Sequence, residues 1–327
     1  MKRLDRRQFL GVIALTLAPL PPVAAQRAAG ARIAYLSLAL PDADRSWLLA
    51  FRSELRALGH EEGRNCTIDV RHAHGHAERL SFLADELLGL KPDVMVVYGA
   101  WHIAHKLAGG PPVVFTVVPD PVAQGVVPSL ARPGGNITGF SDAHADLVPK
   151  RLQLIKEIAP ATKRVGVLYY SSSMTEMQVS AARSAAPSQG LSVIPVVVKG
   201  PQKEEVERAF AAMLKEGAEA LLVIADQTVF TNRGAIAALA IKHRLPVIST
   251  VREWAEAGFT LSYGTNFHDL WRRSAIYVDR ILKGARPGDL PVEQPTKFDL
   301  VVNAKTARAI GVSVPPSLIL QADHVIQ

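Results

Sequence analysis

The sequence predicts an α/β protein made of two doubly wound parallel-sheet lobes, joined by a hinge that the chain crosses several times. Two observations lead to this fold class. Short apolar runs alternate with amphipathic segments of helical period, which is the pattern of a parallel sheet covered by helices. The alternation also restarts near residue 147, and 327 residues is about twice the length of a typical domain of ~150 residues.

The first series of elements runs from residue 32 to residue 118. The expected helices carry apolar residues at helical spacing, and residues 92–99 form the continuous apolar run of a strand buried on both faces. A Pro-Gly-Gly turn lies in residues 130–142. In order, the expected elements are strand 32–38, helix 44–59, strand 66–73, helix 77–90, strand 92–99 and strand 111–118.

The second series predicts helix 147–160, strand 164–170, helix 175–190, strand 191–198, helix 203–217, strand 219–226, helix 234–245 and strand 246–250. Helix 268–284, strand 296–303 and helix 304–311 then follow. Extra elements after a complete second series indicate that the chain returns to the first lobe and builds a hinge. We therefore expect lobe 1 to hold residues 31–142 and about 263–295, and lobe 2 to hold residues 143–262 and about 296–327.

Residues 1–25 have the pattern of an export signal. Residues 6–10, Arg-Arg-Gln-Phe-Leu, fit a twin-arginine address, although an ordinary secretory signal with two arginines is the alternative. The apolar run of residues 11–20 is too short for the ~20 residues that span a bilayer, and small residues end at Ala25, where we expect cleavage. Because Cys66 lies far from this point, we expect no lipid anchor and a soluble periplasmic protein.

Composition narrows the classes of function. Cleavage at Ala25 removes four of the 37 basic and one of the 30 acidic residues, which leaves a net charge of +4. This mild excess gives no argument for nucleic acid. With a single cysteine the chain has no internal disulfide, so burial of its 48% hydrophobic residues must hold both cores.

Several segments together resemble a known family. They are RPGGNITG (132–139), KRLQLIKEIAP (150–160), REWAEAGFTLSYG (252–264), the long stretch 277–311 and VPPSLILQADHVI (314–326). They look like the bacterial ABC-transporter substrate-binding proteins that include tryptophan- and tyrosine-binding members. The resemblance implies a type I periplasmic-binding-protein fold with three interlobe crossings and a small ligand held between the lobes. It also implies delivery to a membrane permease driven by a separate ATPase, with no cofactor, and a monomer.

In this architecture the ligand contacts loops that follow the strands. In lobe 1, Ser37 could donate a hydrogen bond to a ligand carboxylate, unless this loop only caps the next helix. Gly99 and Ala100 permit close approach to the backbone, and Trp101 could stack on an aromatic or cationic ligand or pack within the lobe. Asp120 starts a helix and could also accept a bond from an ammonium group. Trp101 departs from the small residues and proline that are usual in the family at this turn.

In lobe 2, Ser171 and Ser172 could bind a carboxylate, unless they only cap the following helix. Asp226 ends a strand and is a good partner for a ligand ammonium group, with a helix cap or a pair with a nearby arginine as the alternatives. Arg252 could clamp a carboxylate or form an interlobe ion pair. Tyr263 could line the cleft or pack in the hinge.

His72, His74 and His76 alternate in the sequence, so on a strand they would share one face, and imidazoles are good metal ligands. Neighbours two apart on a strand are ~6.6 Å apart, Gly75 suggests that the strand ends first, and no carboxylate or cysteine close in sequence completes a preferred ligand set. We therefore expect no metal here.

Two other classes of function, an enzyme and a sensor, are alternatives to a transport component. An enzyme is disfavoured, because the sequence lacks G-x-S-x-G, H-E-x-x-H, G-x-x-x-x-G-K-[ST] and, after its first strand, G-x-G-x-x-G. A periplasmic sensor that presents its ligand to a membrane receptor would use the same closure, so the sequence leaves this alternative open.

Overall fold

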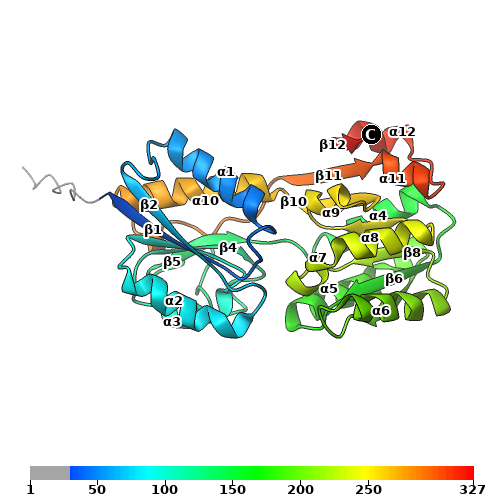
Figure 1. Cartoon of the computed structure of the whole chain (residues 1–327), viewed down its shortest axis with the longest axis horizontal. Coiled ribbons are helices and arrows are strands. Elements are labelled where there is room, and N and C mark those ends of the chain that lie inside the picture. The colour runs from blue at the N-terminus through cyan, green and yellow to red at the C-terminus, as the bar shows by residue number, and fades with distance from the viewer. Residues whose placement is uncertain (1–29) are drawn as a thin grey trace, which may run out of the picture.

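The computed structural model describes residues 30–327, so the expected export signal and its cleavage at Ala25 lie outside the described residues. Two lobes lie end to end along the long axis of the molecule (Figure 1). Lobe 1 contains β1 (Ala31–Ser37), α1 (Arg45–Ala57), β2 (Cys66–His72), η1 (Ala77–Arg79), α2 (Leu80–Gly89), β3 (Val94–Tyr98), η2 (Trp101–Ile103), α3 (Ala104–Leu107), β4 (Val113–Val118) and β5 (Ile137–Ser141). It also receives α10 (Phe267–Leu282) and η4 (Pro287–Asp289) from later in the chain.

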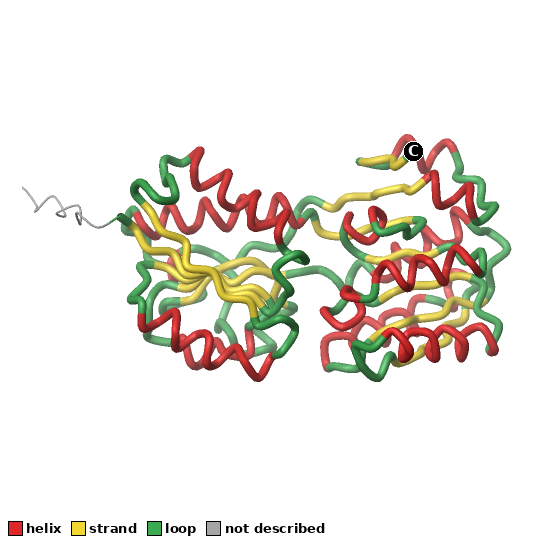
Figure 2. The backbone as a smooth tube through the Cα atoms, viewed as in Figure 1, coloured by secondary structure: helices red, strands yellow, loops and turns green. Residues whose placement is uncertain are grey.

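The sheet of lobe 1 is parallel throughout, in the order β2-β1-β3-β4-β5. Helices α1 and α10 lie side by side over one face, and α2 and α3 cover the other (Figure 2). The central strands β3 and β4 are buried along nearly their whole length, which explains their continuous apolar sequence. All five strands therefore end at the same edge, where ligands bind in doubly wound sheets.

Lobe 2 contains α4 (Val148–Ile158), β6 (Arg164–Tyr169), α5 (Ser173–Ala185), η3 (Pro187–Gln189), β7 (Ser192–Val197), α6 (Lys203–Lys215), β8 (Ala220–Val223), α7 (Gln227–Thr231), α8 (Arg233–Lys242), β9 (Val247–Ser249), α9 (Arg252–Glu256), β10 (Leu261–Thr265), β11 (Phe298–Asn303), α11 (Ala304–Ala309), α12 (Pro316–Gln321) and β12 (His324–Ile326). Its sheet has the order β12-β11-β10-β9-β8-β6-β7. Only the β10–β11 pair among these strands is antiparallel.

The predicted fold class, two α/β lobes with largely parallel sheets, is confirmed. The long elements lie within a few residues of their expected bounds, whereas the short helices α3, α7, α9 and α12 and the strands β5, β10 and β12 were not expected. Strand β5 sits in the segment that we expected to be only a turn. Its residue Gly139 has a φ of +148°, and a Cβ there would lie 2.1 Å from the Phe115 carbonyl oxygen.

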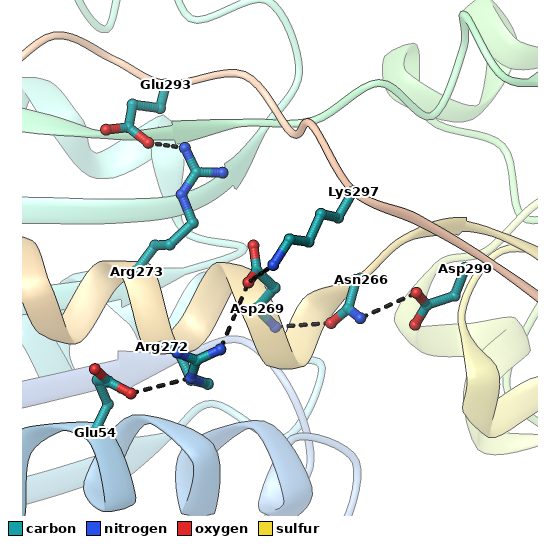
Figure 3. Close-up of polar contacts among 8 residues, drawn as sticks. All are labelled: Glu54, Asn266, Asp269, Arg272, Arg273, Glu293, Lys297 and Asp299. Atoms are coloured by element: carbon teal, nitrogen blue, oxygen red, sulfur yellow. Dashed lines mark hydrogen bonds and ion pairs between the residues drawn. The ribbon is translucent and has the colours of Figure 1, made fainter. Parts of the chain in front are cut away.

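The chain passes between the lobes three times: after β5, after β10 and before β11. Because β10 belongs to the second sheet, the second crossing begins after Thr265. Polar contacts hold the crossings together, as Figure 3 shows. The Asn266 side chain donates to Asp299 Oδ1 at 3.0 Å, and Lys297 Nζ lies 2.9 Å from Asp269 Oδ1 on α10.

Buried side chains form three apolar clusters. Two of them fill the α2–α3 side of the first sheet and the α4–α5 side of the second. The third runs continuously from the α1–α10 side of lobe 1 to the α6–α9 side of lobe 2, and it includes Trp47, Trp271, Phe230 and Trp254. The lobes therefore meet through apolar and aromatic contacts as well as through the three crossings.

Candidate functional site

A cavity of about 350 Å³ lies between the lobes, at the carboxyl ends of the strands of both sheets. The loops after β1, β2 and β3, Val117 of β4 and the crossing after β5 supply much of one wall, and the loops after β6, β8 and β9 supply most of the other. The aromatic side chains of the wall are Trp47, Tyr98, Trp101, Tyr170, Phe230, Trp254 and Phe267. The polar ones include His102, Asp142, His144, Ser172, Gln178, Asp226, Thr228 and Thr250. This mixture of aromatic walls and a few polar groups is typical of small-molecule sites.

Two backbone features shape the lobe 1 wall. Gly99 has a φ of +65°, and a Cβ added there would lie 3.0 Å from Leu38 Cβ, so only glycine fits without displacing its neighbour. Val117 also has a positive φ, of 59°, where β4 and β5 shift register. A β-branched residue rarely adopts this conformation, and such strain tends to persist at functional sites.

Asp226 is the most unusual polar group of the wall. It precedes α7, where its Oδ1 accepts a hydrogen bond from the Val229 backbone N–H at 2.8 Å. Its other oxygen, Oδ2, is buried and has no hydrogen bond. Burial raises the pKa of this carboxyl to about 6, although the nearby N–H groups of Val229, Thr228 and Tyr170 favour the ionised form. The carboxylate therefore lacks a partner that a ligand could provide.

Apart from His144, whose Nδ1 lies beside Asp142, three more side chains of the wall hold buried polar atoms without a hydrogen-bond partner. They are Gln178 (Oε1, 3% exposed), Thr250 (Oγ1, 2% exposed) and Trp254 (Nε1, 0% exposed). Buried polar groups in folded proteins are almost always hydrogen-bonded, so each of these needs an explanation. Their location in one cavity indicates that a bound molecule completes their hydrogen bonding.

The first crossing contributes a second acid whose charge is balanced. His144 Nδ1 lies 3.3 Å from Asp142 Oδ1, and the fully buried Arg151 donates to the His144 carbonyl oxygen at 3.0 Å. Burial alone would raise the pKa of Asp142, but His144 and Arg151 hold it below its ordinary value. Burial lowers the pKa of Arg151 to about 10, which still leaves it charged at neutral pH. Asp142 thus differs from Asp226 in having a cationic partner.

His102 lines the cavity as a neutral ring. Burial lowers its pKa, and a hydrogen bond with the backbone of Ala77 only partly opposes this shift. Because the ordinary pKa of histidine is already near 6.5, the imidazole is uncharged at neutral pH. It offers a hydrogen-bonding nitrogen rather than a positive charge.

Outside the cavity, two hydrogen bonds join the lobes directly. Glu253, on α9 of lobe 2, accepts a hydrogen bond from Trp47 Nε1 at 2.7 Å and one from Ser46 Oγ at 3.2 Å. Both donors lie on α1 of lobe 1. Trp47 also lines the cavity, so a single side chain connects the ligand site to the contact between the lobes.

The family model for ABC transporter substrate binding proteins matches residues 44–326. The chain belongs to this family. Membership places it among substrate-binding proteins, and it confirms the resemblance found in the sequence. A curated relative, the tyrosine-binding protein of Clostridioides difficile, is 24% identical over 278 residues, which are 84% of this chain and 78% of the relative.

Two solved structures of substrate-binding proteins share the fold and a quarter of the sequence. A domain from Streptococcus pneumonia in complex with L-Trp is 25% identical, with a TM-score of 0.81 and coverage of 91% of this chain and 100% of the other. A ligand-free, open substrate-binding protein with adhesive properties from Clostridium difficile is 26% identical, with a TM-score of 0.68 and coverage of 90% and 99%.

The structure brings four of the ten residues proposed from sequence into the cavity wall: Gly99, Trp101, Ser172 and Asp226. The strand-end rule that selected them also applies to Tyr170 and Thr250, which it could have found. Nothing local in the sequence marks four further residues of the wall. Asp142 and His144 come from a crossing, Gln178 lies within α5, and Trp47 lies within α1.

The other three lobe 1 residues lie outside this wall. Ser37 is fully buried and donates to Asp44 Oδ2 at 2.6 Å, so its hydroxyl is occupied within the lobe. Ala100 is buried in the lobe 1 core. The helix expected after Asp120 was wrong, since residues 121–125 form turns and Asp120 accepts a hydrogen bond from the Ala123 N–H at 3.0 Å. Asp120 lines a neighbouring hollow of about 380 Å³ that shares Asp142 with the cavity.

The remaining lobe 2 residues also have other partners. Ser171 Oγ donates to Glu176 at 2.9 Å, and Ser172 forms a capping box with Thr175 while lining the cavity. Arg252 Nε lies 2.7 Å from Glu256 Oε1 on the surface of α9, not in the cavity. Tyr263 lies on β10, where it packs into the lobe 2 core.

The three histidines of residues 72–76 have different surroundings. His72 Nε2 contacts the buried Asp44 at 3.0 Å, His76 pairs with Glu78 at 3.0 Å, and His74 occupies a turn with a φ of 58°. Within residues 30–327 no group of three or more histidine, cysteine or acidic side chains is arranged to hold a metal ion. In the same part of the chain, no helix is long and apolar enough to span a membrane.

Proposed function

We propose that this protein is the extracytoplasmic solute-binding component of an ABC importer and that it binds a small aromatic compound, an amino acid or a related molecule, between its lobes. The observation that carries the proposal is the interlobe cavity itself. Its walls are aromatic, and Asp226, Gln178, Thr250 and Trp254 each present a buried polar atom without a partner. Such a site gains its missing hydrogen bonds when a ligand enters.

The comparisons support this ligand class. The chain is similar to a tyrosine-binding protein and to a domain solved with L-Trp. The higher TM-score with the L-Trp complex, 0.81 against 0.68 for the ligand-free open structure, also supports a closed arrangement of the lobes. A ligand that contacts both walls shifts the population toward this closed form, which would then dock on a permease.

Export and delivery complete the proposal. The twin-arginine pattern before Ala25 would carry a folded chain, without a cofactor, to the periplasm, where we expect a monomer. A permease and its ATPase would then receive the ligand. A periplasmic sensor would need the same cavity, so uptake must be measured to distinguish the two: loss of uptake of the ligand on deletion of the gene is expected for an importer.

Thermal unfolding tests the binding proposal. Residues 26–327 would be unfolded and refolded to remove any bound ligand, and then melted with a panel of amino acids, aromatic amines and small carboxylates. A ligand that binds only the folded state must raise the melting temperature by mass action. We expect a clear rise with aromatic members and none with aliphatic ones. A rise confined to aliphatic compounds would contradict the proposed ligand class.

A further inference from the structure

The negative charges of the ionisable side chains in the cavity wall are not fully balanced by positive ones. The wall holds two acids, Asp142 and Asp226, and two imidazoles, His102 and His144, and no lysine or arginine lines it. His102 is neutral because burial lowers its pKa. The charge of Asp142 is offset by His144 beside it and by the buried Arg151. The only group of the wall whose charge has no counterpart is therefore Asp226.

No other side chain of the described protein supplies that counterpart. Arg233, the nearby arginine that the sequence offers as an alternative partner, donates to the Phe230 carbonyl oxygen at 3.0 Å and lies 4.3 Å above the Phe230 ring instead. It lines a neighbouring groove that also includes Phe230, and it does not line the cavity. Asp226 Oδ2 thus remains buried without a hydrogen bond or an ion pair. A buried carboxylate is costly in this state, and a cationic ligand relieves the cost.

We propose that the ligand is an aromatic amine, in which a flat ring carries a positively charged nitrogen that binds Asp226 and no free carboxylate lies beside that nitrogen. The inference rests on the proposed function, because it concerns the ligand of the same cavity. It separates two compounds of nearly equal shape, an aromatic amino acid and the amine that lacks its carboxylate.

The argument against the amino acid is electrostatic. Its carboxylate lies roughly 3 Å from its ammonium nitrogen. Bound at Asp226, it would place a second negative charge near the first, in a wall without lysine or arginine, and like charges at this range repel. An amine brings only the charge that the wall lacks. The aromatic rings around the amine add cation–π attraction to its positive charge. In a zwitterion this attraction is weaker, because the carboxylate offsets the charge of the ammonium group.

Matched compounds test the inference by titration calorimetry on residues 26–327. The pairs are tyramine with L-tyrosine and tryptamine with L-tryptophan, and the acids without an amine are 3-(4-hydroxyphenyl)propionate and indole-3-propionate. We expect at least one amine to bind at least tenfold more tightly than its amino acid, and no binding of the acids. Asp226→Asn keeps the size of the side chain and its capping oxygen, and we expect it to weaken amine binding at least tenfold.

The possible outcomes separate the two proposals. An amino acid that binds as tightly as its amine, or more tightly, overturns the inference and leaves the proposed function standing. An amine whose affinity survives Asp226→Asn also overturns the inference, because the charged contact would then lie elsewhere. If neither series binds, the aromatic ligand class itself fails, and both proposals fall together.

Discussion

Two aspartates with buried carboxylate oxygens, one in each lobe, occupy similar positions in the sequence and have opposite surroundings. Asp44 follows β1 and precedes α1, and Asp226 follows β8 and precedes α7. Asp44 is 0% exposed, and both of its oxygens have partners within lobe 1. Asp226 has one oxygen in a helix cap and the other without a partner.

The partners of Asp44 show that it is a structural residue. Tyr35 and Ser37 donate to its Oδ2 at 3.1 and 2.6 Å, and His72 Nε2 lies 3.0 Å from its Oδ1. Trp271, on α10, in turn donates to the Tyr35 hydroxyl at 3.0 Å, so the network ties the returning helix to β1. The contrast shows that a buried carboxylate indicates a ligand site only where one of its oxygens has no hydrogen-bond partner within the fold.

The largest effect is expected from removing the structural aspartate, Asp44. Asp44→Ala would leave the buried hydroxyls of Tyr35 and Ser37 without their acceptor, so we expect a loss of roughly 3 kcal/mol in the free energy of unfolding. This corresponds to a fall of about 6–12 °C in the melting temperature. Asp42→Ala, at an exposed neighbour, is the matched control. A variant that melts within 1 °C of the wild type would show that the network contributes little.

The next effect concerns Asp226, the aspartate proposed to bind the ligand, and it depends on pH. With its pKa near 6, Asp226 is about one-tenth ionised at pH 5, so the affinity for an amine should fall about tenfold between pH 7.5 and pH 5. Titration calorimetry at both values measures this change. His102 and His144 also line the cavity, so the same titration on Asp226→Asn is the control, and we expect its affinity to change less. An equal pH response in both proteins would assign the titration to another group.

A smaller effect should come from the contact between the lobes. Glu253→Ala removes the acceptor of Trp47 Nε1 and Ser46 Oγ and so destabilises the closed form by about 1 kcal/mol, which lowers ligand affinity about fivefold. Glu256→Ala, on the same helix, is the control. Calorimetry measures the affinity, and small-angle scattering should show a larger radius of gyration at subsaturating ligand. Equal affinities for the two variants would remove Glu253 from the closure.

The smallest expected effect is that of Arg252→Ala. Since Arg252 pairs with Glu256 on the surface and does not line the cavity, we expect its removal to change ligand affinity less than twofold. Surface pairs of this kind contribute little to stability as well. A tenfold loss of affinity on calorimetry would restore Arg252 as a carboxylate clamp and would contradict the charge balance described for the cavity.

The sequence predicted the fold because its long elements carry their own signal. The apolar run of β3 and the amphipathic period of α10 are local patterns that identify a buried strand and a surface helix without any knowledge of their neighbours. Short elements lack this signal. The three residues of β12 form a strand only because β11 lies beside them, and the five residues of β5 contain Gly139, which is unfavourable in most strands.

The site was predicted less completely, because the position of a loop does not determine where its side chains find partners. Ser37 ends strand β1 and Asp226 comes shortly after β8, yet Ser37 binds a buried aspartate of its own lobe and Asp226 Oδ2 has no partner. Gln178 was missed for the converse reason, since it lies inside a helix and reaches the cavity only through the packing of the lobes.

The most direct test of the central claim is the melting temperature of ligand-free and amine-saturated Asp226→Asn against that of the wild type. Because the pKa of Asp226 is raised in the folded state, folding is favoured when the group is protonated, and this stability is lost as the pH rises from its ordinary pKa of 3.8 through about 6. At pH 7.5, asparagine mimics the neutral form. We therefore predict that the ligand-free variant melts at least 2 °C above the wild type and gains less from the amine. A variant that melts below the wild type without ligand, and gains as much from the amine, would contradict the account.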